Sequence, residues 1–313
     1  MDRDHSIDAF RGLAILGMVF FTVTLRLSSN LPEILRHNVW GTVHFGDFIL
    51  PMFLFASGLS LAYYLQKREK EKKFILRSVV LRFGKLVLIG VALSIFSAYG
   101  FLEMDEVMLS AILFIVCVGL SKLNWKIIMG IIFVINLSYI ALIQLDMISI
   151  FIGHYLGGYP AALYYLPVML TGLVIGKGII SKGFWCNINK TVFWTTFIFF
   201  LLFLIYIPLN KMTVTPSFIM LSILFSYIIF AATYTIVANK IHLKRLEYLG
   251  QKPIRYWLMM YLFFLIPLWF YVKFFKQNFP FNLQWYLAVM LSLVIIIILY
   301  AISRVIDYIT ISN

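Results

Sequence analysis

The sequence predicts an all-α protein, a polytopic bundle of about ten membrane helices that forms a single transmembrane domain over residues 1–313. The first observation is composition, because 62% of the residues are hydrophobic, only 12% are charged, and the mean hydropathy is +0.95. A soluble domain carries roughly 25% charged residues. A chain with so little charge cannot cover a surface that faces water. We therefore expect an integral, multi-pass protein of the cell membrane.

The second observation is a series of long apolar runs. A membrane helix needs about 20 largely apolar residues, and in lipid the backbone must satisfy its own hydrogen bonds. The runs do not alternate between apolar and polar residues, as the strands of a membrane barrel would. The fourth run is short. The ten predicted helices lie near residues 8–25, 46–65, 80–101, 107–121, 127–145, 161–180, 191–208, 216–238, 254–272 and 284–303.

The third observation is where the Lys and Arg residues fall between these runs. Cytoplasmic connections of membrane proteins are enriched in Lys and Arg. With the amino terminus in the cytoplasm, 21 of the 26 Lys and Arg residues fall on the cytoplasmic side. This bias predicts that both termini are cytoplasmic and that the number of helices is even. It also accounts for the net charge of +13, so we expect no nucleic-acid partner. The His and Cys spacing contains no metal-binding pattern, so no metal is predicted.

Two short motifs place ionisable residues at the ends of the predicted helices. In "SIDAFRGLAILGMVFF", Asp8 and Arg11 are three residues apart, so on a helix they share one face and can pair. In "HNVWGTVHFGDFILPMFLFASG", His37, Trp40 and Asp47 precede or open the second run on the outer side. The alternative for each motif is an interfacial role: an anchor for Asp8 and Arg11, an aromatic belt for Trp40, and an ordinary loop for His37.

Three further segments carry basic residues or glycines. Arg77, Arg82 and Lys85 continue a basic segment into an apolar run, where they could contact lipid phosphates or the phosphates of a nucleotide-bearing cofactor. In "LGQKPIRYWL", Arg255 opens the ninth run on the cytoplasmic side. Gly172 and Gly176 form a small-xxx-small pair, which predicts close packing against a neighbouring helix.

These motifs together resemble the family of heparan-alpha-glucosaminide N-acetyltransferase and its microbial relatives, within the transmembrane acyltransferases. The resemblance rests on "SIDAFRGLAILGMVFF", "HNVWGTVHFGDFILPMFLFASGLSL", "LPVMLTGLVIGK" and "LGQKPIRYWL", which occur in the family's order. It implies a transmembrane acyltransferase domain that moves an acetyl group from cytoplasmic acetyl-CoA to the amino group of a terminal glucosamine on the far side.

The resemblance also implies roles for individual residues. His37 has the spacing of the family's essential histidine relative to Trp40 and Asp47, whereas His44 does not. His37 is thus the expected nucleophile or base, and Asp47 the group that orients it. Trp40, Asp8 and Thr22 are the expected substrate-binding residues. The cations expected to hold the CoA phosphates are Arg11, Arg77, Arg82, Lys85 and Arg255.

Two departures from the family affect this assignment. Thr22 stands where relatives commonly carry Asn or His, and Met260 stands where they often carry His. Neither replaces a titrating imidazole, so the chemistry rests on His37 alone or the acceptor differs. The sequence leaves two alternatives open: an O-acyltransferase of a surface polysaccharide, and a transporter of a polar lipid or sugar. Expected partners are acetyl-CoA, an amino-sugar or glycan acceptor and membrane lipid, with a homodimer as an alternative to a monomer.

Overall fold

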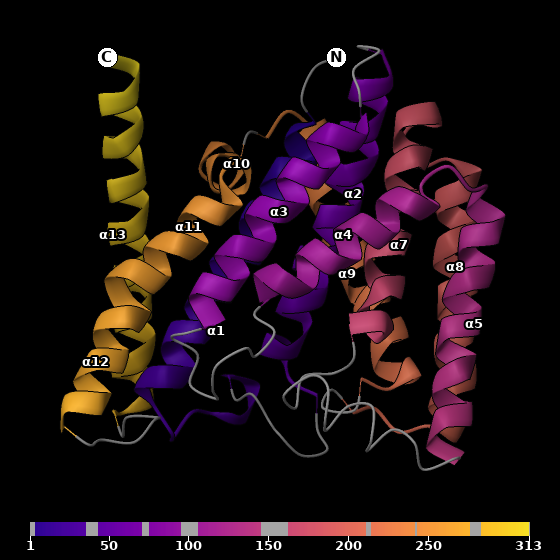
Figure 1. Cartoon of the computed structure of the whole chain (residues 1–313). Coiled ribbons are helices and arrows are strands. Elements are labelled where there is room, and N and C mark those ends of the chain that lie inside the picture. The colour runs from indigo at the N-terminus through magenta and orange to yellow at the C-terminus, as the bar shows by residue number, and fades with distance from the viewer. Residues whose placement is uncertain are drawn as a thin grey trace. The chain divides into compact units, whose positions relative to one another are not determined.

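The computed structural model describes residues 4–35, 43–70, 75–94, 106–144, 162–210, 214–241, 243–275 and 283–312 (Figure 1). These residues form helices and contain no β-strand, which confirms the all-α prediction. The chain divides into two compact units. The terminal unit comprises Asp4–Asn38, His44–Ile49 and Thr233–Asn313, and the central unit comprises Met1–Arg3, Val39–Val43 and Leu50–Ala232. Each unit is described by itself.

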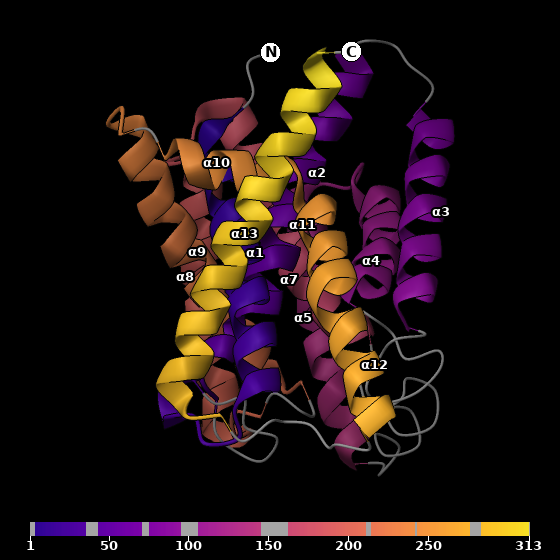
Figure 2. The same cartoon turned by 90° about the vertical axis from the view of Figure 1, so that its left-hand side faces the viewer.

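The terminal unit is built on α1 (His5–Leu27), which begins where the Asp4 side chain accepts the Ser6 backbone N–H at 2.9 Å. Two short 3-10 helices follow, η1 (Glu33–Leu35) and η2 (Phe45–Phe48). Near the other end of the chain, α10 (Lys244–Gln251) packs closely against the first half of α1, and α13 (Trp285–Ser312) runs beside α1 (Figure 2).

One helical rod in this unit has a change of geometry in its middle. It consists of α11 (Pro253–Met260), the π-helical turn η3 (Tyr261–Leu265) and α12 (Ile266–Phe275). A π-helical turn inserts an extra residue into a helix and is frequent at functional sites. Here it begins directly after Met260, which is fully buried.

The central unit is a bundle in which α7 contacts α4, α5 and α8. Its helices are α2 (Ile49–Lys70), α3 (Ile75–Ser94), α4 (Glu106–Leu120), α5 (Trp125–Gln144), α7 (Ala162–Lys182), α8 (Asn187–Tyr206) and α9 (Pro216–Ala238); α2 starts, and α9 ends, with residues of the terminal unit.

Helices α2 and α7 approach closely because glycines face the opposite backbone. A Cβ atom built on Gly172 would lie 2.2 Å from the Phe55 carbonyl oxygen, and one on Gly58 would lie 2.1 Å from the Met169 carbonyl oxygen. Gly176 faces Leu59 and Ala62 in the same way. The predicted packing of the Gly172–Gly176 pair is confirmed, and α2 is the neighbour.

Seven helical segments of the described residues are long and apolar enough to cross a membrane, judged by length and composition. They are His5–Leu27, Phe45–Lys70, Tyr164–Ser181, Asn187–Tyr206, Pro216–Ala238, Pro253–Phe274 and Trp285–Thr310. The other three predicted spans correspond to α3, α4 and α5. These are helices, but within the described residues they do not meet the length and composition expected of a membrane span. The number of about ten spans, the position of the termini and the single-domain assignment therefore stay predictions.

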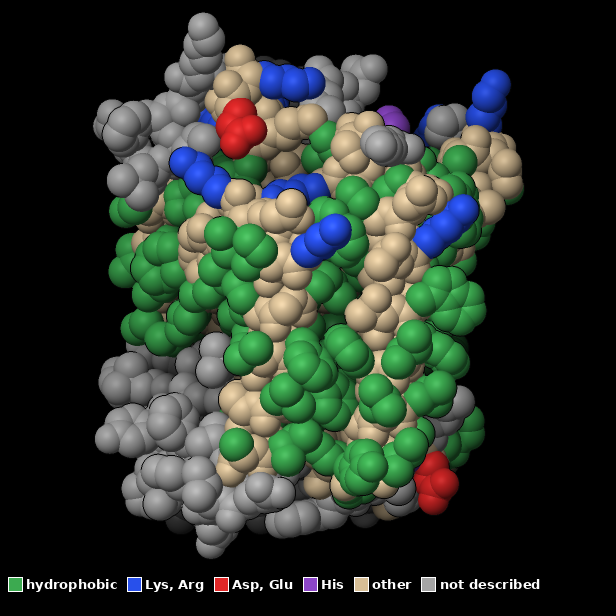
Figure 3. Space-filling view, turned by 90° about the vertical axis from the view of Figure 1, so that its right-hand side faces the viewer, with side chains coloured by type: hydrophobic (Ala, Val, Ile, Leu, Met, Phe, Trp, Pro, Cys, Tyr) green, Lys and Arg blue, Asp and Glu red, His purple; other side chains and the backbone are tan. Residues whose placement is uncertain are grey.

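Charged and apolar side chains separate on the surface. Figure 3 shows one face on which hydrophobic side chains cover the middle, while Lys and Arg side chains gather towards one end. Exposed large apolar residues are numerous on α8 and α13, for example Tyr206 and Ile297. An apolar belt with cations at its edge is what a protein surrounded by lipid requires.

Candidate functional site

Asp47 lies in η2 and is completely buried. Its Oδ2 atom accepts the backbone N–H of His44 at 2.8 Å, and its own backbone N–H donates to the His44 carbonyl at 3.0 Å. This reciprocal pairing is why the sequence forms a tight helical turn before α2. The turn fixes the position of the carboxylate at the start of α2. His37 and Trp40 lie outside the described residues.

The second half of α1 packs against η2. A Cβ atom on Gly46 would lie 2.9 Å from the Phe21 ring, and one on Gly17 would lie 2.7 Å from the Ile49 side chain. The turn of α1 that carries Thr22 is therefore beside the turn that carries Asp47. Among the residues predicted near the acyl acceptor, the structure therefore brings together the helical segments that carry Thr22 and Asp47.

The first half of α1 carries Asp8 and Arg11, whose side chains pair at 3.2 Å as their spacing predicts. Arg11 Nη1 also donates to the Gly250 carbonyl of α10 at 2.7 Å. A Cβ atom on Gly12 would lie 1.9 Å from the Leu246 carbonyl oxygen, so the two backbones touch here. Asp8 and Thr22 are 14 residues apart on one helix, roughly 20 Å, so the structure does not bring these two predicted substrate-binding residues together.

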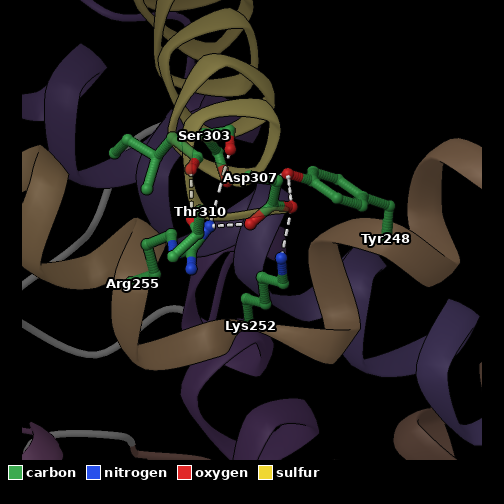
Figure 4. A network of polar contacts seen from close by, with 7 residues as sticks. Tyr248, Lys252, Arg255, Ser303, Asp307 and Thr310 are labelled. Atoms are coloured by element: carbon green, nitrogen blue, oxygen red, sulfur yellow. Dashed lines mark hydrogen bonds and ion pairs between the residues drawn. The ribbon is translucent and has the colours of Figure 1, made fainter. Parts of the chain in front are cut away.

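Arg255 belongs to a network centred on Asp307 of α13 (Figure 4). Its Nη1 atom lies 2.5 Å from Asp307 Oδ1, while Lys252 and the Tyr248 hydroxyl both donate to Asp307 Oδ2. The Tyr248 hydroxyl also lies 3.1 Å from Ser303 Oγ. Burial, followed by the hydrogen bond to Asp307, raises the pKa of Tyr248, so the phenol stays protonated and donates.

This network joins α10, α11 and α13. Lys252 is the single residue between α10 and α11, with a backbone conformation outside the helical region. Because α10 also touches Asp8 and Arg11 of α1, the polar ends of α1, α10, α11 and α13 form one connected cluster within the terminal unit.

The remaining predicted donor-binding cations, Arg77, Arg82 and Lys85, lie on α3 of the central unit. Arg82 and Lys85 are exposed. The Arg82 guanidinium carbon lies 5.5 Å from the centre of the Tyr64 ring and 5.2 Å from that of the Phe114 ring. The side chain of Arg77 lies outside what the structure describes. The terminal and central units thus each carry part of the predicted donor-binding set.

Sequence reasoning missed the helix α10 and the role of Asp307. The sequence predicts no helix between residues 238 and 254, yet Lys244–Gln251 is helical. An acidic residue inside the very apolar last helix was a usable signal, because such a residue normally has a partner. Its partners are more than 50 residues away in the sequence, so local residue spacing does not identify them.

Comparison with known proteins agrees with the motif order. A family model described as heparan-alpha-glucosaminide N-acetyltransferase, catalytic, matches residues 3–204, well over half of the 313-residue chain. The matched region includes α1, η2 and the segment between them. A search of curated proteins gives no match.

Proposed function

We propose, from the premise that this chain belongs to the heparan-alpha-glucosaminide N-acetyltransferase catalytic family, that it is a membrane acetyltransferase acting on an amino sugar. The donor is acetyl-CoA, which binds from the cytoplasmic side. The acceptor is the amino group of a terminal glucosamine-like residue on the other side of the membrane. The reaction requires no metal ion.

One observation carries this proposal: the family match covers the segment in which His37, Trp40 and Asp47 occur at the family's spacing. The structure supports it by burying Asp47 in a turn that packs against the Thr22 end of α1. A carboxylate held in this way can orient a nearby imidazole and stabilise its charged form.

In the proposed reaction, a neutral imidazole nitrogen of His37 attacks the thioester carbonyl. A C–N bond forms, the C–S bond breaks, and CoA leaves as the thiolate. The acceptor amine then attacks the acetyl-imidazole, the amide forms, the bond to His37 breaks, and the proton that the amine loses passes through the released imidazole to solvent. In the alternative route, the acceptor amine attacks the thioester directly while His37 takes its proton, and CoA leaves as the thiolate. Both routes need an imidazole that is neutral near pH 7, and the ordinary pKa of His, about 6.5, provides it.

The donor side of the proposal uses Arg11 of α1 and Arg255 at the start of α11. Arg11 and Arg255 would contact CoA phosphates at one end of α1, and the pantetheine arm would extend along the helix to Asp47. The glycines of α1, α2 and α7 would not line this path, because the backbone of a neighbouring helix fills the space beside Gly12, Gly58 and Gly172.

The experiment is CoA release from acetyl-CoA by the purified protein in detergent, with a panel of amino sugars, for the native chain and His37→Ala. We expect release that an amino sugar stimulates and that the variant loses by at least about 10²-fold. His44→Ala is the matched control, because it keeps the backbone N–H that Asp47 accepts.

Each other result contradicts part of the proposal. Release that survives His37→Ala would move the chemistry to another group, with His44 and Asp47 tested next. Release stimulated only by sugars without an amino group would indicate an O-acyltransferase. The absence of release with every acceptor would favour a transporter.

A further inference from the structure

The cations of the predicted donor site differ in what lies beside them. Arg11 pairs with Asp8, and Arg255 pairs with Asp307. Arg82 forms no ion pair with any residue that the structure describes, and its guanidinium lies instead on the Tyr64 and Phe114 rings. An aromatic ring attracts a cation but contributes no neutralising charge.

A second arginine uses the same ring. The Arg68 guanidinium carbon, on the last turn of α2, also lies 5.5 Å from the centre of the Tyr64 ring. Within the described ranges, Arg68 has no carboxylate partner either. Two guanidinium groups, one from α2 and one from α3, therefore lie on one tyrosine ring. Two like charges near one ring repel each other, and an anion beside them would stabilise the arrangement.

We propose that Arg68, Tyr64 and Arg82 form a phosphate-binding site on the central unit. The guanidinium group is planar and offers paired N–H donors that match two phosphate oxygens. The Tyr64 ring lies beside both groups, one from its own helix α2 and one from α3. The site would take a ligand in which the phosphate is the recognised group.

Two sources can supply that phosphate. One is the headgroup of an anionic phospholipid, because α3 exposes Leu81 and Leu88 next to Arg82 and the exposed Lys85. Apolar and basic side chains on one exposed helix face suit the level of lipid headgroups. The other source is the nucleotide part of CoA, and this second source rests on the proposed function. Arg68 would then join Arg82 in the donor site.

The experiment measures binding of three probes to the purified protein in detergent: phosphatidylglycerol in mixed micelles, CoA, and CoA without its 3′-phosphate. Phosphatidylcholine micelles are the neutral control. The variants are Arg68→Gln, Arg82→Gln and the double variant that combines them. The matched control is Lys126→Gln, which removes another exposed cation that lies on an aromatic ring, Trp125, in the same unit.

We expect each single variant to bind the recognised probe about tenfold more weakly and the double variant about 100-fold more weakly, since each loses one charge-assisted contact. Lys126→Gln should bind within about twofold of the native chain. Loss for phosphatidylglycerol alone assigns the site to lipid. If the double variant binds CoA more weakly than the native chain does, and removal of the 3′-phosphate from CoA weakens binding to the variant little further, the site is assigned to the donor.

Native affinity of the double variant for all probes, or no binding of any probe by the native chain, overturns the proposal. If the double variant fails to fold, Arg68→Lys with Arg82→Lys keeps both charges but removes the planar N–H pairs, and weaker binding is still expected. His37→Ala separates this site from the proposed function, because it should abolish acetyl transfer while both phosphatidylglycerol and CoA still bind.

Discussion

At the scale of single residues, Asp47 combines a structural contact with a proposed catalytic role, and two substitutions separate them. Asn at this position keeps an oxygen that can accept the His44 N–H, but it removes the negative charge. We expect Asp47→Asn to lower acetyl transfer at least about tenfold with little change in melting temperature. Asp47→Ala should lower activity similarly and also cost about 1 kcal/mol of stability, because the turn loses its cap.

Steady-state CoA release and thermal unfolding of the two variants check this prediction. Full activity in Asp47→Asn would show that the carboxylate is only a structural group. In that case the orienting partner of His37 would have to come from another segment.

Residue-level prediction worked where the relevant information was local. The pairing of Asp8 with Arg11 follows from their spacing on one helix, and the structure confirms it. The partner of Arg255 could not be found in this way, because Asp307 approaches it only through the packing of α13 against α11. The roles given to His37 and Trp40 stay predictions, since both residues lie outside the described part of the chain.

At the scale of helices, glycines decide how closely pairs of helices approach. In Gly172→Ala the new Cβ atom would lie 2.2 Å from the Phe55 carbonyl oxygen, so α2 and α7 would have to separate. Backbone atoms cannot give way as a flexible side chain can. We expect a loss of roughly 1–3 kcal/mol of stability, comparable to overpacking a core, measured as earlier thermal unfolding in detergent.

Gly130→Ala on α5 is the matched control, because a Cβ atom there meets no other atom within 4 Å. This change should be neutral or slightly stabilising, since Ala favours a helix by up to about 1 kcal/mol relative to Gly. Equal melting temperatures for Gly172→Ala and the native chain would contradict the close approach of α2 and α7.

The Asp307 network connects α13 to the turn between α10 and α11, so loss of the Asp307 charge should lower stability. In Asp307→Asn the charge that Lys252 and Arg255 share is lost. The side chains of Asp307, Lys252 and Arg255 are between 17% and 30% exposed, so water screens part of the effect. We expect the melting temperature to fall by only about 2–4 °C.

A second readout distinguishes positioning from stability alone. If the network positions Arg255 for CoA, Asp307→Asn should also change the affinity for CoA, and Thr310→Ala on the same exposed helix face should change neither quantity. An unchanged melting temperature in Asp307→Asn would show that the network does not hold the helices.

The helices themselves were largely predictable, because length and hydropathy determine where a chain can cross lipid. Eight of the ten predicted runs overlap their helices with ends displaced by about five residues or fewer. The run predicted to end at 101 corresponds to α3, whose described part ends at Ser94, and the last helix continues past the expected end at 303 to Ser312. The sequence did not reveal α10, since eight residues with mostly polar side chains carry no membrane signal. It also did not reveal the π-helical turn after Met260, which depends on packing rather than on composition.

At the scale of the whole molecule, the number of crossings determines where the termini lie. Within the described residues, seven helices are long and apolar enough to cross a membrane, and an odd number of crossings would place the two termini on opposite sides. Ten crossings require α3, α4 and α5 to span as well. Helix α3 carries three cations, and α4 has 15 residues, about 22 Å against a hydrocarbon core of roughly 30 Å. The distribution of Lys and Arg nevertheless predicts an even number.

Labelling of single cysteines with a membrane-impermeant maleimide resolves this conflict. Cys117 and Cys186 are both buried and would be replaced by Ala, after which Arg36→Cys, Lys70→Cys and Asn313→Cys are made one at a time. The even count predicts that intact cells label Arg36→Cys only, and that the other two react after the membrane is opened. Labelling of Asn313→Cys in intact cells would mean an odd number of crossings. Because Arg36 is next to His37, labelling at this position in intact cells is also required for an acceptor that reaches His37 from outside.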